Sequence, residues 1–490
     1  MSSTSHEAVP LKVLLATPEC APLVKTGGLG DVSASLPPAL RALGLDARVL
    51  LPGYPAVLAG NPGAKGLGSA VVLGKEVRLL EGTLPTGVPL LIIDCPALFA
   101  RNGGPYQSDD GSDWADNALR FGVLSRMAAL LGSAHSPIAW RPDVVHAHDW
   151  PAALAPVYLH FDMRPRAASL ITIHNLAFQG VFEFSRIAGL ELPAESLGTK
   201  GLEFYGRHSF LKGGLVYADA ISTVSPTYAR EIQGEELGFG MDGVLRERSD
   251  RLHGVLNGID TVTWDPEHDA HIPSRYGARN LEAKRPNKAA LRERLGLGGD
   301  GGKPLMAMVT RLTHQKGIDI VVAAAERILA LGAQFTVCGT GDKELVGRLR
   351  GLQARHPQDV GLSISFDEPL AHLIEAGADI FLMPSRFEPC GMNQMYSQRY
   401  GTPPIANATG GLVDTVFDEH RAVDVAPTGF LMNEATPEAL LEACSRAISA
   451  FRDPAQWRAL QLNGMSRDFG WAAAALKYQE IYEKLVSDTN

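Results

Sequence analysis

The strongest constraint on this chain is an alternation of short apolar runs with amphipathic stretches, which occurs in two series along 490 residues. Such alternation is typical of βα units, whose parallel strands are buried on both faces. The first series comprises LKVLLATPE from Leu11, VPLLIID from Val88, DVVHAH from Asp143, SLITIHN from Ser169 and DAISTVS from Asp219. The second comprises PLMAMVTR (304–311), QFTVCGTG from Gln334, LSISF from Leu362, DIFLMPS (379–385) and PPIAN from Pro403. We therefore predict an α/β fold with two Rossmann-like domains that face a cleft.

The region between the two series is polar and carries Pro and Gly, roughly from His268 to Lys303. This composition favours a domain change there, although the crossover could lie nearer Asn257. The division that we adopt is 1–255, 256–470 and a final segment, 471–490. In that segment Leu476, Ile481 and Leu485 recur at helical spacing, which predicts a helix that packs against a domain.

Composition and charge exclude several classes of protein. A net charge of −9 and a pI near 5.9 argue against binding of nucleic acid, which needs a clustered basic surface. The first ten residues, MSSTSHEAVP, lack the features of a secretion signal, and no stretch is long enough to span a bilayer. The five cysteines show no CxxC spacing, so neither a disulfide framework nor a structural zinc site is indicated. We expect a cytoplasmic protein with reduced thiols and no membrane partner.

Charged residues follow the strands of the second series. Glu388 comes just after DIFLMPS, and ligands of open α/β sheets collect where such strands end. Arg311 ends another strand, and Lys316 lies five residues on, near the start of a helix. Gly410 and Gly411 follow PPIAN and open backbone amides to an anion. A sugar attached to a diphosphate suits this combination of an acid, two cations and backbone amides.

In the first series, the first strand leads into KTGGLGD, residues 25–31. Its glycines let the backbone approach a ligand, and Lys25 supplies a positive charge. The segment does not match the dinucleotide fingerprint GxGxxG, because Gly28 and Gly30 are followed by Ser33 at the third glycine position. This mismatch argues against a NAD-dependent dehydrogenase. An ordinary strand-to-helix turn remains the alternative, and Lys25 favours a functional loop.

Histidines occur at the ends of two further strands of the first series. His146 and His148 alternate on one strand, so they lie on one face, with Asp149 next in sequence. No third ligand at a metal-binding spacing accompanies them, and we predict cleft or packing residues instead of a metal site. His174 ends SLITIHN, and by itself it is better interpreted as a satisfied core histidine.

Taken together, the motifs resemble those of the bacterial glycogen synthases and plant starch synthases over nearly the whole chain. In order they are KTGGLGD, HAHDW, HNLAFQG, FLKGGLVYAD, LNGID, TRLTHQKG, PSRFEPCG and ATGGLVDTV. The resemblance implies a GT-B glycosyltransferase that moves glucose from ADP-glucose to the non-reducing end of an α-1,4-glucan such as glycogen, with retention of anomeric configuration. It implies neither a metal nor another cofactor. It also implies that the final helix crosses back to the first domain, and that the first domain is the acceptor side and the second the nucleotide-sugar side.

Roles carried over from the family motifs are expectations at this stage. The residues at the reaction centre would be His174, Glu388, Asp149, Arg311 and Lys316. Those that bind the donor would be Lys25, Gly28, Asn257, Phe366, Gly410 and Gly411. Asp31 would face the acceptor.

The chain departs from the family pattern at three places. Phe366 stands where a tyrosine usually lies against adenine, so stacking would survive without a phenolic hydrogen bond. Pro151 replaces a histidine after HDW, and Met392 and Asn393 replace a leucine and a threonine after EPCG. Cys390 matches the family cysteine beside the acid, and a packed, unreactive thiol is its better interpretation.

Three other functions remain open from the sequence. A GT-B enzyme that uses UDP-glucose or another acceptor would share the phosphate-binding devices. A glucan phosphorylase would need a pyridoxal phosphate lysine and a much longer chain. A non-catalytic glucan-binding protein would bind glycogen and release no ADP, and the charged residues at the strand ends argue against it.

Overall fold

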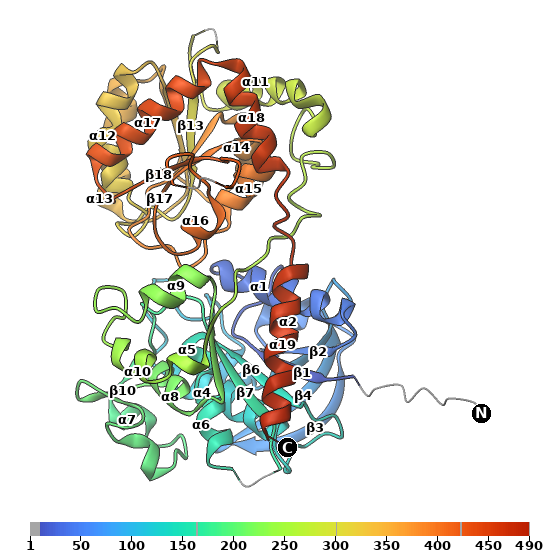
Figure 1. Cartoon of the computed structure of the whole chain (residues 1–490). Coiled ribbons are helices and arrows are strands. Elements are labelled where there is room, and N and C mark those ends of the chain that lie inside the picture. Colours follow the sequence, from blue (N-terminus) through green and yellow to red (C-terminus); the bar gives the residue numbers. More distant parts are fainter. Residues whose placement is uncertain (1–9, 163–164, 300, 422–423, 490) are drawn as a thin grey trace. The chain divides into compact units, whose positions relative to one another are not determined.

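The computed structural model describes residues 10–162, 165–299, 301–421 and 424–489. The chain forms two compact units (Figure 1). Unit 1 extends to Gly258 and also includes the segment from Trp471, whereas unit 2 is Ile259–Gly470. None of the described helices combines the length and the apolar character that crossing a membrane requires.

Unit 1 is built on a nine-stranded sheet within the described residues, in the order β12-β11-β7-β6-β1-β2-β5-β4-β3. All neighbours are parallel except at the edge, where β4 runs antiparallel to β5 and β3. The strands are β1 (Lys12–Ala16), β2 (Asp46–Pro52), β3 (Lys65–Val72), β4 (Lys75–Thr83), β5 (Pro89–Asp94), β6 (Val144–His148), β7 (Ala168–Ile173), β11 (Ala220–Thr223) and β12 (Leu252–Gly254). A smaller sheet joins β8 (Val181–Phe182), β10 (Arg207–Ser209) and β9 (Glu203–Phe204).

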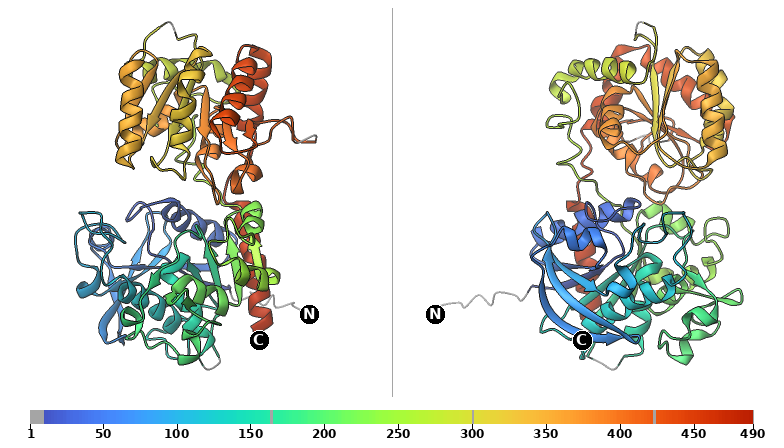
Figure 2. Two further views of the ribbon diagram at one scale, coloured as in Figure 1. Left: turned by 90° about the vertical axis from the view of Figure 1, so that its left-hand side faces the viewer. Right: turned by 180° about the vertical axis from the view of Figure 1, so that it is seen from behind.

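Helices cover both faces of the large sheet, as the alternation of buried residues along β1 requires (Figure 2). Val13 and Leu15 pack in one core with α1 and α19, whereas Leu14 and Ala16 pack in another with α4, α6 and α8. The helices of unit 1 are α1 (Gly28–Ala42), α2 (Pro55–Ala59), α3 (Pro96–Phe99), α4 (Asn117–Leu131), α5 (Asp149–Ala152), α6 (Leu154–His160), α7 (Phe184–Ile187), α8 (Phe210–Tyr217), α9 (Pro226–Glu231), α10 (Asp242–Glu247) and α19 (Ala472–Thr489).

The last helix, α19, belongs to unit 1 although it follows unit 2 in sequence (Figure 1). Its apolar stripe, which includes Tyr478, Ile481 and Leu485, is buried against β1, β6 and β7. Leu476, which the sequence placed on this stripe, is instead 50% exposed. Tyr482 is fully buried in the same core and also makes a hydrogen bond to the sheet through His146. The end of the chain therefore completes one face of the first sheet.

Unit 2 contains a six-stranded, wholly parallel sheet within the described residues, in the order β15-β14-β13-β16-β17-β18. Its strands are β13 (Leu305–Val309), β14 (Gln334–Cys338), β15 (Val360–Ser363), β16 (Ile380–Met383), β17 (Pro404–Asn407) and β18 (Phe430–Met432). One core packs α12, α13 and α17 on the sheet, and another packs α11 and α14 on the opposite face. The helices are α11 (Arg285–Arg294), α12 (Ile318–Ala330), α13 (Lys343–Arg355), α14 (Glu368–Gly377), α15 (Asn393–Arg399), α16 (Gly410–Thr415), α17 (Pro437–Phe451) and α18 (Pro454–Met465).

The α/β class predicted from the sequence is confirmed, and each strand of the two predicted series is present. The strand expected from Leu362 begins two residues earlier, at Val360. The hairpin β3–β4 was not predicted, because it is glycine-bearing and half-exposed and so has no continuous apolar run. The polar region 268–303 folds within unit 2, where it includes α11.

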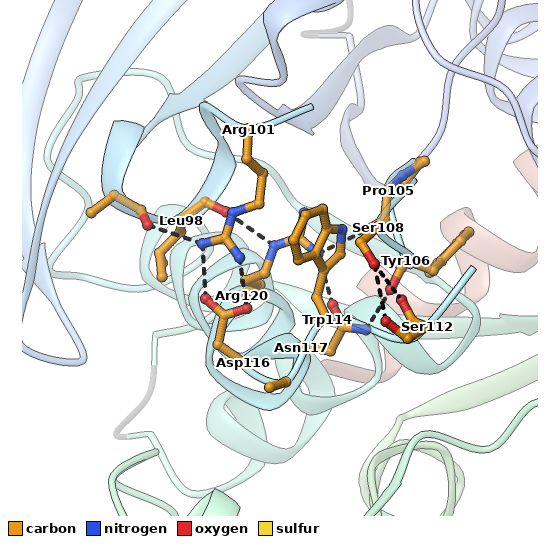
Figure 3. A network of polar contacts seen from close by, with 12 residues as sticks. Leu98, Arg101, Pro105, Tyr106, Ser108, Ser112, Trp114, Asp116, Asn117 and Arg120 are labelled. Atoms are coloured by element: carbon orange, nitrogen blue, oxygen red, sulfur yellow. Dashed lines mark hydrogen bonds and ion pairs between the residues drawn. The ribbon is translucent and has the colours of Figure 1, made fainter. Parts of the chain in front are cut away.

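A fully buried cation, Arg120 on α4, organises the loop that precedes this helix (Figure 3). Its guanidinium donates to the carbonyl oxygens of Leu98 and Pro105, at 3.0 and 2.8 Å, and to the Asn117 side chain at 2.7 Å. Asn117 in turn donates to the carbonyl oxygen of Tyr106 at 2.8 Å. Since buried polar groups must be paired, these bonds hold the loop in one conformation.

We expect Arg120→Met to lower the free energy of unfolding by about 2–4 kcal/mol, because several acceptors lose their buried donor. Differential scanning calorimetry measures the change. Arg126→Met is the matched control, since this arginine is on the same helix and lies 4.8 Å from the ring centre of Tyr158, a contact worth about 0.5–1 kcal/mol. Equal losses in the two variants would contradict the assignment to Arg120.

Candidate active site

In unit 1 the residues singled out from the sequence follow the carboxyl ends of strands β1, β6, β7 and β12. The strand order reverses beside β1, which has β2 on one side and β6 on the other. Ligands of open α/β sheets bind at such a switch point, because the loops of the two neighbouring strands diverge there. Lys25, His174 and Asn257, which lie in loops, and Asp149, which begins α5, therefore lie at the carboxyl ends of strands of one sheet.

The loop after β1 places Lys25 against the start of α1. Lys25 Nζ lies 2.7 Å from Asp31 Oδ1, in an ion pair that is partly open to solvent. Gly28 is the first residue of α1, and the side chain of Lys25 runs along Gly30, where an added Cβ would lie 3.1 Å from it. The sequence assigned Lys25 and Asp31 to different substrates, and the structure pairs them.

Glu19 fixes the conformation of this loop, and the sequence motifs did not single it out. It is 3% exposed, and its Oε2 accepts the backbone N–H groups of Thr26, at 2.5 Å, and Gly27, at 3.1 Å. Its Oε1 accepts the hydroxyl of Tyr106 at 2.6 Å. Burial raises the pKa of Glu19. A buried acid after a strand was the available signal, but its partner Tyr106 is 87 residues away in sequence.

Asp149 and His174 are joined across β6 and β7. The backbone N–H of His174 donates to Asp149 Oδ1 at 2.7 Å. Asp149 has a φ of 55°, a left-handed conformation that few residues with a side chain adopt. Burial raises the pKa of Asp149 to about 7 and lowers the pKa of His174 to about 3. His174 is thus neutral at physiological pH.

Two buried histidines of β6, His146 and His148, lie behind His174. His148 Nδ1 is 2.9 Å from His174 Nε2, and His146 contacts Tyr482 and Thr172. Within the described ranges, no group of three or more His, Cys, Asp or Glu side chains is arranged to hold a metal ion. His146 and His148 are packing residues with specific hydrogen bonds.

Asn257, after β12, presents an unused polar atom. Its side chain is 6% exposed, and its Oδ1 has no hydrogen-bond partner among the residues that the structure describes. A buried amide oxygen without a donor is unfavourable unless a ligand or water supplies one. Asn257 is therefore suited to accept a hydrogen bond from a hydroxyl group.

In unit 2 the strand order reverses beside β13, between β14 and β16, and the charged residues follow β13 and β16. Lys316 Nζ lies 2.5 Å from Glu388 Oε2, and Ser385 Oγ donates to the same oxygen at 3.0 Å. Gly317 has a φ of 71° and approaches Pro384 so closely that an added Cβ would lie 2.2 Å from the Pro384 carbonyl oxygen. This close approach of the two turns brings the cation and the acid together.

Arg311 and Phe366 extend from the same edge of the second sheet. Arg311 is exposed, and none of the described residues makes a hydrogen bond or ion pair with its side chain. Phe366 follows β15 and is 78% exposed, which is unusual for an aromatic side chain. A free guanidinium and an exposed ring are available to a phosphate and a base.

The glycine pair after β17 packs on the backbone beside Glu388. Gly410 has a φ of 48°, and an added Cβ would lie 1.9 Å from the Glu388 carbonyl oxygen. The Gly411 N–H donates to that same carbonyl at 3.1 Å. The sequence suggested that this amide is open to an anion, whereas here it stabilises the turn that carries Glu388.

Comparison with known proteins identifies the family. A model of the starch synthase catalytic domain matches residues 12–247, and a model of glycosyl transferases group 1 matches residues 292–459. A glycogen synthase from Aromatoleum aromaticum is 54% identical over 98% of this chain and 98% of its own length. Another, from Nitrosomonas eutropha, is 51% identical over 97% of this chain and 96% of its own length. The chain belongs to the glycogen synthase and starch synthase family.

Solved structures agree with this assignment. The catalytic domain of starch synthase IV from Arabidopsis thaliana, bound to ADP and acarbose, superposes with a TM-score of 0.87 at 32% identity, over 98% of this chain and all of that one. A sucrose-phosphate synthase from Thermosynechococcus elongatus, 20% identical with a TM-score of 0.60, shares the fold. The fold is thus GT-B, and the protein is a glucosyltransferase of the glycogen synthase type.

One departure from the family pattern has a local structural account. Asn393 directs its side-chain amide to the carbonyl oxygen of Val309, at 2.5 Å, and so supports the end of β13 just before Arg311. Pro151 accepts a hydrogen bond from Ser125 at 3.1 Å only through its main-chain carbonyl oxygen, so nothing in the structure explains the proline. Cys390 is 5% exposed, in keeping with a packed thiol.

We expect Asp149→Asn to stabilise the protein more at pH 8 than at pH 5. The pKa of this carboxyl is about 7 in the folded chain against 3.8 ordinarily, so between these values the folded state binds more protons than the unfolded one. Stability therefore falls as pH rises through this window, and asparagine removes the loss. One pKa unit corresponds to ~1.4 kcal/mol of stability. Because the side chain is partly open to solvent, we expect a smaller gain than the full shift gives, about 1–3 kcal/mol in the free energy of unfolding at pH 8.

Thermal unfolding of the parent and the variant at the two pH values measures this difference. Asparagine also suits the left-handed backbone at this position, so the substitution adds no strain. Glu235→Gln, at an exposed position, is the control and should leave the pH dependence unchanged. A variant whose stability follows the same pH profile as the parent would show that Asp149 is not the group responsible.

Proposed function

We propose that this glucosyltransferase moves glucose from ADP-glucose to the non-reducing end of an α-1,4-glucan, with retention of anomeric configuration. The observation that carries the proposal is the ion pair of Lys316 and Glu388 at the switch point of unit 2, with Arg311, which has no side-chain partner among the described residues, at the end of the same strand β13. Two cations and one carboxylate at the ends of neighbouring strands suit a diphosphate joined to a sugar. The relatives named glycogen synthase and the ADP bound by the starch synthase IV structure support this donor.

Unit 2 would be the nucleotide-sugar side in this proposal. Arg311 and Lys316 neutralise the diphosphate, and Glu388 holds hydroxyl groups of the transferred glucose. When substrate binds, the phosphate would compete for Lys316, which releases the Glu388 carboxylate to the sugar. Phe366 stacks on adenine without a phenolic hydrogen bond, and the close packing at Gly410 and Gly411 keeps the Glu388 turn in place.

Unit 1 would be the acceptor side in this proposal. Lys25 and Gly28 approach the donor phosphates, and Asp31 faces the acceptor glucan. Three residues would line the transferred glucose, namely His174, Asn257 and Asp149. The unpaired Oδ1 of Asn257 supports this role, because a sugar hydroxyl would supply the missing donor.

In the reaction that we propose, the bond between glucosyl C1 and the phosphate oxygen breaks, and its electron pair goes to ADP. The 4-hydroxyl of the acceptor attacks C1 from the same face and gives its proton to the departing phosphate oxygen. Negative charge grows on the diphosphate as the sugar becomes oxocarbenium-like, so fixed cations lower the barrier by binding the transition state more strongly than the substrate. No protein nucleophile takes part.

The compartment that we propose is the cytoplasm. The five cysteines are all free and buried, as is usual where thiols are kept reduced. Nucleic acid and membranes are not partners in this proposal.

We expect Arg311→Ala to lower kcat on the order of a hundredfold, by analogy with the loss of one donor to a developing oxyanion. Its effect on the KM for ADP-glucose should be smaller, because the charge grows mainly in the transition state. Steady-state release of ADP with glycogen as acceptor measures both constants. Arg350→Ala, at an exposed position on α13, is the matched control. Normal turnover in Arg311→Ala would refute the assigned role.

A second test concerns the nucleotide. With glycogen as acceptor, we expect ADP-glucose to support faster nucleotide release than UDP-glucose at equal concentration. The alternative is a GT-B enzyme that prefers a UDP-sugar, and a clear preference for UDP-glucose would establish that alternative. Binding of glycogen with no release of either nucleotide would indicate a non-catalytic glucan-binding protein.

A further inference from the structure

The three histidines at the ends of β6 and β7 form a continuous row inside unit 1. The ring centres of His146 and His148 are 4.1 Å apart, and those of His148 and His174 are 5.2 Å apart, with the ring planes of each pair tilted by 33° and 36°. His146 and His148 are fully buried, whereas His174 is only partly buried. The row therefore runs from the core of the unit to the carboxyl ends of the strands, where the site residues lie.

Each ring in this row carries a single N–H. Burial lowers the pKa of His146 and His148 well below the ordinary value and that of His174 to about 3, so all three imidazoles are neutral. A neutral imidazole has one nitrogen that donates and one that accepts. The hydrogen bond between His148 Nδ1 and His174 Nε2, at 2.9 Å, then has two possible directions.

The unused nitrogen of His148 distinguishes the two directions. His148 Nε2 is buried and has no hydrogen-bond partner among the described residues. If His174 donated, the proton of His148 would lie on Nε2, as a buried N–H without an acceptor. If His148 donates from Nδ1, Nε2 keeps only an unshared electron pair. Orphaned buried N–H groups are the rarer of the two in proteins, so the second direction is favoured.

The direction of this bond decides what His174 offers to a ligand. When His174 Nε2 accepts from His148, the proton of His174 must lie on Nδ1. That nitrogen makes no hydrogen bond to the described residues, and His174 is not fully buried. His174 therefore presents an N–H donor toward the edge of the sheet.

His146 holds His148 in place from behind. Its Nδ1 is 2.8 Å from the hydroxyl of Tyr482 on α19, and its Nε2 is 2.5 Å from Thr172 Oγ1 on β7. Thr172 Oγ1 in turn makes a hydrogen bond with Ser222 Oγ on β11, at 2.5 Å. Since both nitrogens of His146 are bonded, its ring is fixed, and the His148 ring that packs on it has little freedom to turn.

We propose that His148 is a positioning residue that holds His174 in its Nδ1–H tautomer, so that His174 donates a hydrogen bond to a hydroxyl oxygen of the transferred glucose. The proposal deepens the proposed function and rests on the place of His174 in the sugar site. Tyr482 on α19 supports the same arrangement, because its hydroxyl makes a hydrogen bond with His146. The pairing of Asn257 as acceptor with His174 as donor would match the two hydrogen-bonding capacities of sugar hydroxyls.

The first experiment observes the tautomer directly. Nitrogen-15 NMR of the protein labelled at histidine distinguishes a protonated Nδ1 from a protonated Nε2, and the His174 signals are assigned by their loss in His174→Asn. We expect protonated Nδ1 in His174 and in His148. A protonated Nε2 in His174 would overturn the proposal, and this result does not depend on which reaction the protein catalyses.

The second experiment uses a pair of substitutions at His148. In His148→Asn the side-chain amide nitrogen takes the place of Nδ1 and still donates, whereas His148→Leu donates nothing. We expect His148→Leu to lose about 10–100-fold in kcat, as is usual when the partner that orients a functional histidine is removed. His148→Asn should stay within about threefold of the parent, because the amide preserves the bond that sets the tautomer.

The pair also separates failure of this proposal from failure of the proposed function. If the parent protein releases no nucleotide from ADP-glucose, the proposed function fails, and the NMR result still decides the tautomer. If the parent is active and both variants, with the thermal stability of the parent, lose the same activity, donation by His148 is refuted. Equal full activity in both variants refutes it as well.

Discussion

The burial of parallel strands on both faces is the constraint on which the rest of this structure depends. Because helices cover the faces of both sheets, a loop can contact a ligand only at the ends of the strands. The strand order then selects the place, beside β1 in unit 1 and beside β13 in unit 2, where successive loops diverge. Lys25, Asp149 and His174 in the first unit, and Arg311, Lys316 and Glu388 in the second, all follow strands next to these points or one strand away.

Buried polar networks then set the conformation of those loops. Glu19 ties the loop of Lys25 to Tyr106, and the loop of Tyr106 is held in turn by the buried Arg120 (Figure 3). In unit 2 the close approach of Gly317 to Pro384 brings Lys316 to Glu388. Each network is fully or nearly satisfied, as a low-dielectric interior requires, so the functional side chains start from defined positions. In the reaction that we propose, a pre-organised site of this kind would stabilise charge in the transition state.

Most of the architecture was predictable from the sequence, because doubly covered parallel strands are short apolar runs that local composition reveals. The strands that escaped prediction include the half-exposed hairpin β3–β4 and the very short β12 and β18. They also include β2, a mostly buried strand of seven residues that pairs with β1. The candidate residues at the strand ends were predictable for the same reason, since Glu388 and His174 follow recognisable strands. Glu19 and Tyr106 were not, because their partnership joins positions that are distant in sequence.

The sequence by itself determined the α/β class, the two series of strands, the motifs and, through them, the family and the glucosyl-transfer chemistry. These depend on local periodicity and on residue types at fixed short spacings. Only the tertiary structure decided which groups pair: Lys25 with Asp31, Lys316 with Glu388, Gly411 with the Glu388 carbonyl, and His148 with His174. It also decided that the last helix completes unit 1. Hydrogen bonds and pKa shifts depend on burial and on distances of a few ångströms between segments that only folding brings together.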